Sequence, residues 1–134
     1  MSTARNALVK YLKADAGLMN LVTAVYPKEP PERPEFPFVQ VVTQKDPTPE
    51  RTFQKIVAEE SIFQVKAVDQ NTSPLRAEKI AAAIRARLDR AVLTIPGYSS
   101  VEVLWLQDID QSEEFNGQIF QYEGGLYQVF AEVA

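Results

Sequence analysis

The sequence contains no cysteine and no histidine. Without cysteine, disulfides, thiolate zinc sites and cysteine nucleophiles are excluded. Without histidine, the chain lacks the commonest general base and the commonest ligand of transition metals. No apolar run approaches the roughly 18 residues of a membrane span, and the N-terminus has no signal-peptide core. We therefore expect a protein of the cytosol that is not an enzyme and that holds no cofactor or metal.

The composition that remains is ordinary for a globular domain. The chain has 134 residues, of which 46% are hydrophobic and 24% charged. This length predicts a single domain over residues 1–134, with a substantial core. The formal net charge is −4, which disfavours non-specific binding of nucleic acid by the surface as a whole.

The periodicity of apolar residues predicts the order helix, helix, strand, strand, helix, strand, strand. The first helices form a short amphipathic pair before Val25, and the strands lie near residues 38–43, 61–68, 101–106 and 126–133. The clearest helix follows Ser73 and Pro74, and its apolar stripe consists of Ala77, Ile80, Ala81, Ile84 and Leu88. We expect an α+β fold, in which a mostly antiparallel sheet of about four strands is packed against one long helix and the N-terminal helix pair.

Two proline-containing segments interrupt this pattern. Residues 27–37 contain five prolines and predict an extended surface arm. Residues 45–59 predict a long loop or a protruding hairpin arm, and long loops in compact domains are often functional. Phe53 either folds back on the domain or is covered by a partner. The candidate partner-interface residues on this arm are Lys45, Arg51, Phe53 and Lys55.

Other charged or glycine-rich stretches have simpler explanations. The acidic run of residues 108–114 begins like a calcium loop, but Glu113 and Ile119 occupy the positions that need glycine and a bidentate acid, which favours a hairpin tip. The pair Gly124-Gly125 lacks the spacing of a phosphate loop and indicates a turn or bulge. The basic residues of the clear helix indicate a solvated face or a charged subunit interface. They are Arg76, Lys79, Arg85, Arg87 and Arg90.

Several segments together resemble the tail-completion, or tail-terminator, proteins of long-tailed bacteriophages. The matching segments, in chain order, are ALVKYLKADAGLMNLV, the Val25-Tyr26-Pro27 step, FPFVQVVTQ, SIFQVKAVDQ, SPLRAEKIAAAIRARLD and GLYQVFAEV. Each is an ordinary helix or strand, so the order and spacing carry the resemblance, which covers most of the chain.

The resemblance implies a structural protein of the virion, assembled in the host cytoplasm. Such proteins form a hexameric ring at the head-proximal end of the tail tube, stop tube polymerisation and present a docking surface to the head-side connector. The implied partners are further copies of the chain, the tail tube protein and the connector. DNA would pass through the ring without specific binding, and no membrane is involved. The alternatives are a head–tail adaptor of the neck and a soluble binding module unrelated to phages.

Overall fold

The computed structural model describes residues 3–52 and 55–134, which form three helices and six strands. The elements are α1 (Thr3–Lys13), α2 (Ala16–Met19), β1 (Val25–Tyr26), β2 (Phe38–Thr52), β3 (Lys55–Gln70), α3 (Leu75–Leu88), β4 (Val92–Leu93), β5 (Tyr98–Phe115) and β6 (Gln118–Val133). Phe53, one of the candidate interface residues, lies outside the described residues. Within the described part of the chain, no helix is long and apolar enough to cross a membrane.

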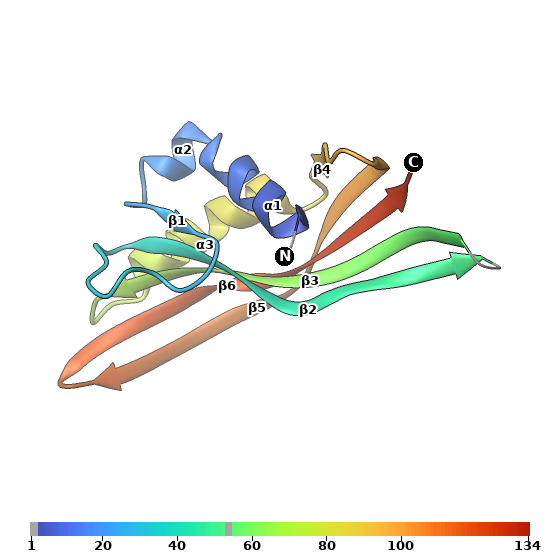
Figure 1. Ribbon diagram of the computed structural model, residues 1–134. Coiled ribbons are helices and arrows are strands. Elements are labelled where there is room, and N and C mark those ends of the chain that lie inside the picture. The colour runs from blue at the N-terminus through green and yellow to red at the C-terminus, as the bar shows by residue number, and fades with distance from the viewer. Residues whose placement is uncertain (1–2, 53–54) are drawn as a thin grey trace.

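The strands form one twisted sheet in the order β1-β2-β3-β6-β5-β4 (Figure 1). β1 and β2 are parallel, and every other pairing in this sheet is antiparallel. Long β2, β3, β5 and β6 dominate the structure, and the helices gather on one side of the sheet.

The expected fold class is therefore wrong. Strands outweigh helices in the structure, and the sheet differs from the expected one. The sheet is mixed and has six strands instead of about four, and the helices are small, with 11, 4 and 14 residues. β1 and β4 have two residues each, which is too short for an alternating pattern to appear in the sequence. The long strands were underestimated because their polar ends continue as hairpins, where backbone pairing satisfies the peptide groups whatever the side chains are.

The core lies between the sheet and the helices. Four of the five residues of the predicted stripe of α3, Ala77, Ile80, Ile84 and Leu88, are fully buried, and Ala81 is half-buried. They pack with α1 and with the inward side chains of the long strands, among them Phe63, Val65, Val129 and Tyr127. Burial of Ile80, Ile84 and Leu88 contributes ~1.5–3 kcal/mol each.

Gly124 and Gly125 lie inside β6 and form no turn. A Cβ atom at Gly124 would lie 2.1 Å from the carbonyl oxygen of Val65 and 2.5 Å from the Cα of Lys66. Gly124 pairs with Lys66 of β3, so only glycine lets the two backbones approach so closely. The register shifts between β5 and β6 lie instead at two places in β5, between Tyr98 and Ser100 and between Trp105 and Gln107.

Candidate assembly surfaces

The hairpin of β5 and β6 extends well beyond the helices (Figure 1, lower left). Its strands pair without interruption from Gln107–Leu126 to Phe115–Gln118. The turn residues Asn116 and Gly117 both have positive φ, 51° and 77°, as a two-residue hairpin of type I′ requires. The prediction of an acidic hairpin that ends in Asn-Gly is confirmed. Phe115 at its tip is 63% exposed, which offers an aromatic side chain to a partner.

β2 and β3 form a second projecting hairpin, which extends in the opposite direction (Figure 1, right). Residues 45–52 and 55–59, which the sequence suggested as a loop or hairpin arm, belong to these two strands. The ammonium group of Lys45 lies 3.5 Å from the carboxylate of Glu60. Arg51 pairs with Ile56, and Lys55 pairs with Thr52, so the backbones of Arg51 and Lys55 lie close together near the end of the hairpin, while Lys45 lies nearer the body. Their role at a partner interface stays a prediction.

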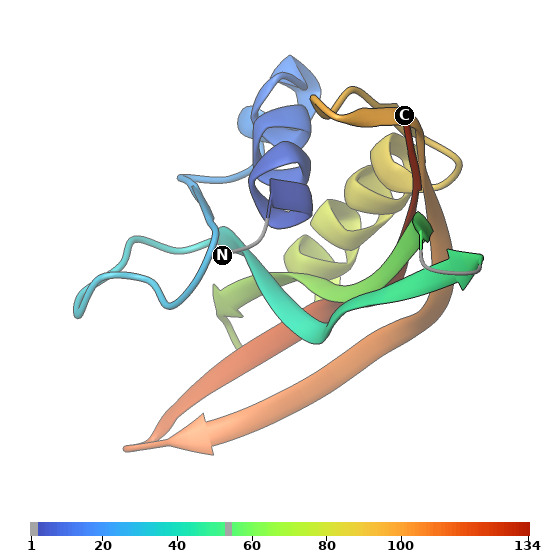
Figure 2. The same cartoon turned by 45° about the vertical axis from the view of Figure 1, so that its right-hand side comes forward.

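The helices leave one face of the sheet uncovered (Figure 2). This face carries apolar side chains. At one end of this face the proline-rich arm covers Phe38, whose ring centroid lies 5.5 Å from that of Phe36 and 5.3 Å from that of Tyr26. Elsewhere Leu104 and Leu106 are 36% and 41% exposed. An uncovered sheet face with exposed leucines is typical of a surface that other subunits cover.

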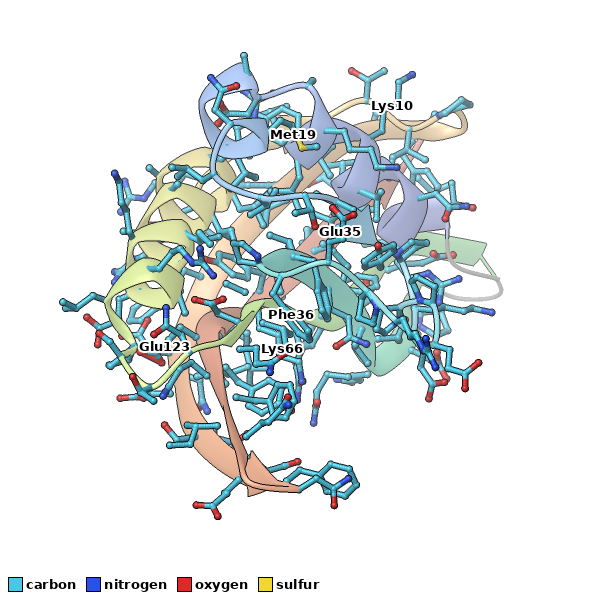
Figure 3. All side chains as sticks on the ribbon, turned by 90° about the vertical axis from the view of Figure 1, so that its left-hand side faces the viewer. Lys10, Met19, Glu35, Phe36, Lys66 and Glu123 are labelled. Atoms are coloured by element: carbon cyan, nitrogen blue, oxygen red, sulfur yellow. The ribbon has the colours of Figure 1, made fainter. Side chains whose placement is uncertain are left out.

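An acidic pocket of about 350 Å³ lies where α3 crosses β5 and β6. Its carboxylates are Glu78 of α3, Asp108 and Asp110 of β5, and Glu123 of β6. Asp110 and Glu123 face each other as paired residues of the hairpin. Figure 3 shows Glu123 between α3 and β6. Glu123 is only 6% exposed, and its Oε2 is buried without a hydrogen-bond partner.

The surroundings of Glu123 disfavour its charged form. Burial, followed by a hydrogen bond with Asp110 and the negative charges of Asp110, Glu78 and Asp108, raises the pKa of Glu123 to about 7. Arg85 also lines the pocket, but its guanidinium group lies 3.7 Å from the ring centroid of Trp105, on which it stacks. The pocket therefore holds more negative than positive charge, with one carboxylate that ionises near neutral pH.

The arginines of α3 interact with their own chain. Arg76 donates two hydrogen bonds to the fully buried Asp69, at 2.6 and 2.9 Å. Arg87 donates to the carbonyl oxygen of Tyr11 at 3.0 and 3.2 Å, and it stacks on the ring of the same residue. These contacts fix α3 to the sheet and to α1, so Arg76, Arg85 and Arg87 serve the fold of the subunit.

The sequence did not reveal Glu123 as a buried carboxylate. A signal for it exists, because Glu123 is in phase with the inward residues Tyr127, Val129 and Ala131 of the same strand. Continuing their alternation toward the N-terminus through Gly125 places Glu123 on the helix-covered face. The proximity of Glu78, by contrast, depends on how α3 crosses the hairpin, which no local pattern encodes.

These features define a class of protein: a structural subunit with projecting hairpins and an uncovered sheet face, suited to assembly with other subunits. Residues 6–129 match the family model of the tail completion protein gp17, and the chain belongs to that family. It is thus a structural protein of a phage or phage-like virion, where it associates with other tail or head proteins.

Two solved structures share the fold of this chain. A chain from the virion of a native gene transfer agent particle is 20% identical and superposes with a TM-score of 0.76, over 96% of this chain and 94% of the other. A second solved chain is 15% identical with a TM-score of 0.57, over 97% of this chain and 91% of the other. No curated protein matches the sequence.

Proposed function

We propose that this protein forms a hexameric ring at the head-proximal end of the tail tube. The ring stops polymerisation of the tube and gives the head-side connector a surface on which to dock, and DNA passes through it without specific binding. The observation that carries the proposal is the family match over residues 6–129.

The shape of the subunit supports a ring. The two hairpins leave the body in opposite directions, so each subunit offers different surfaces to its two neighbours. An interface between unlike surfaces closes into a ring when the rotation between subunits divides a full turn. The exposed side chains of Phe115, Leu104 and Leu106 supply apolar area for such contacts or for contacts with the tube.

The length of tails assembled without the protein tests this function. Electron microscopy of lysates from a deletion mutant should show tubes that run past the normal length and lack heads. Expression of the wild-type chain from a plasmid should restore both the length and the heads. Tails of normal length that only fail to join heads would instead identify the protein as a head–tail adaptor, which is the alternative function.

A further inference from the structure

We propose that the acidic pocket binds a lysine side chain of a second copy of this chain, supplied by Lys10 or Lys13 of α1. This contact would join neighbouring subunits of the ring proposed above, and it rests on that proposal. It assigns the pocket as one half of the interface between neighbouring subunits and the end of α1 as the other half.

The pocket carries an excess of negative charge. Glu78, Asp108, Asp110 and Glu123 line it, and Arg85 is engaged with Trp105. The Oε2 atom of Glu123 is buried and has no hydrogen-bond partner. A buried carboxylate is costly unless a cation or a donor pairs with it, so the free subunit leaves this oxygen unsatisfied.

An ammonium group suits the pocket better than a metal ion does. Among the described residues, no group of three or more acidic side chains is placed so that it could hold a metal. A metal needs several oxygens at about 2.0–2.6 Å from one point. A lysine is a point charge on a flexible stem and donates hydrogen bonds in three directions, so it can pair with carboxylates that do not converge.

α1 is the natural source of the lysine. It carries no acidic residue over Thr3–Lys13, and its last turn presents Lys10 and Lys13, both exposed. In the described part of the chain neither forms an ion pair. By contrast, Lys45 is paired with Glu60 and Arg76 with Asp69.

The lysines and the pocket of one subunit lie apart. Figure 3 shows Lys10 beside α1 at the top of the molecule and Glu123 beside α3 at its lower left. The lysine of one copy therefore meets the pocket of another copy. Because the two surfaces differ, every subunit uses both, which is the arrangement that a closed ring requires.

The contact should strengthen as the pH rises from 6 to 8. Ionisation of Glu123 in this range adds a negative charge to the pocket. The charged groups that face Glu123 are Asp108 and Asp110 from β5 and Glu78 and Arg85 from α3. From β3, Ala67 lies opposite Glu123, and the next inward acid, Asp69, is paired with Arg76. Glu123 is the group of the pocket whose raised pKa, about 7, lies within this range.

Because the chain has no cysteine, an engineered pair reports the contact directly. We would place Lys13→Cys and Asp110→Cys in one chain, purify tails that carry it, and oxidise them. The expected result is a ladder of disulfide-linked species from dimer to hexamer on a non-reducing gel. The control pair, Lys13→Cys with Glu102→Cys, uses an exposed acid of β5 outside the pocket and should give no ladder.

A second experiment uses charge reversal in complementation of the deletion mutant. Lys10→Glu with Lys13→Glu should lower the titre at least tenfold, as should Glu78→Lys with Asp110→Lys. The chain that carries all four changes should recover most of the titre. Glu123→Gln should remove the difference in assembly between pH 6 and pH 8.

The outcomes separate this contact from the ring. If glutaraldehyde links wild-type subunits in tails into a ladder but the engineered pair gives none and the fourfold reversal gives no recovery, the contact is wrong and the ring stands. If glutaraldehyde gives no ladder, the ring itself fails, and the contact fails with it. If assembly depends on added Mg²⁺ or Ca²⁺ and is insensitive to Lys10 and Lys13, a metal occupies the pocket and the lysine assignment is overturned.

Discussion

Replacement of Glu123 by glutamine should stabilise the isolated subunit by an amount that grows as the pH rises from 4.5 to about 7 and is then constant. The pKa of Glu123 rises from 4.5 to about 7 in the fold. A raised carboxyl pKa means that the folded state binds the proton more tightly than the unfolded state does. The stability that this proton gives is fully present below pH 4.5 and is lost as the pH rises through 7. The difference in pKa corresponds to ~3 kcal/mol of unfolding free energy.

Glutamine cannot ionise, and its amide can still donate a hydrogen bond to Asp110. The unfolding free energy of Glu123→Gln should therefore exceed that of the wild type by ~3 kcal/mol at pH 8, and the two should converge toward pH 4.5. Urea unfolding followed by the fluorescence of Trp105, the single tryptophan, measures this difference between pH 4.5 and 8. The protein must be dilute enough to be monomeric, since a bound lysine would lower the pKa.

The matched control is Glu114→Gln, at the exposed tip of the same hairpin. Its unfolding free energy should follow that of the wild type at every pH. If the curve of Glu123→Gln also runs parallel to that of the wild type, Glu123 ionises as an ordinary glutamate. The description of the pocket as a site with an excess of negative charge around a buried carboxylate would then be refuted.

Three further changes test the fold and the predicted arm. Arg76→Ala should lower the unfolding free energy by ~3 kcal/mol, because it leaves the buried carboxylate of Asp69 unpaired. Gly124→Ala should cost ~2 kcal/mol or more, because the added methyl group meets the backbone of β3, and urea unfolding measures both variants. Arg51→Ala with Phe53→Ala should block the joining of tails and leave the circular dichroism spectrum and the melting temperature unchanged.

Each of these three predictions has an outcome that would contradict it. Lys79→Ala is the control for Arg76→Ala, because it removes an exposed cation of α3 nearby. If Lys79→Ala lowers the unfolding free energy as much as Arg76→Ala does, the ion pair of Arg76 with Asp69 does not account for the loss. A Gly124→Ala variant as stable as the wild type would mean that β3 and β6 do not approach as closely as described. If tails that carry Arg51→Ala with Phe53→Ala join heads normally, the arm is not a partner interface.

The sequence predicted those parts of the fold that depend on local periodicity. Ile80, Ile84 and Leu88 recur at the helical repeat, and all three are buried on α3. Val129 and Ala131 alternate as a strand requires, and Asn116-Gly117 marked the turn of a hairpin. The order of the segments also pointed to the tail-completion family, which the match over residues 6–129 confirms.

The ends of the long strands could not be read in the same way. Residues 45–52 contain two prolines and several charges, which indicate a loop, yet they pair with β3 along most of their length. β2 is an edge strand over this stretch, where proline is tolerated because one side of the backbone needs no partner. Hydrogen bonds between strands far apart in sequence decided this region, and side-chain patterns carry little information about them.

By itself, the sequence determined the absence of cysteine and histidine, the positions of the main apolar stripes and the family. Each of these depends on residue identity or on near neighbours along the chain. The tertiary structure alone decided that the sheet has six strands and that carboxylates from α3, β5 and β6 share one pocket. The pKa of Glu123 follows from that pocket, because burial and the charges of residues distant in sequence act through space.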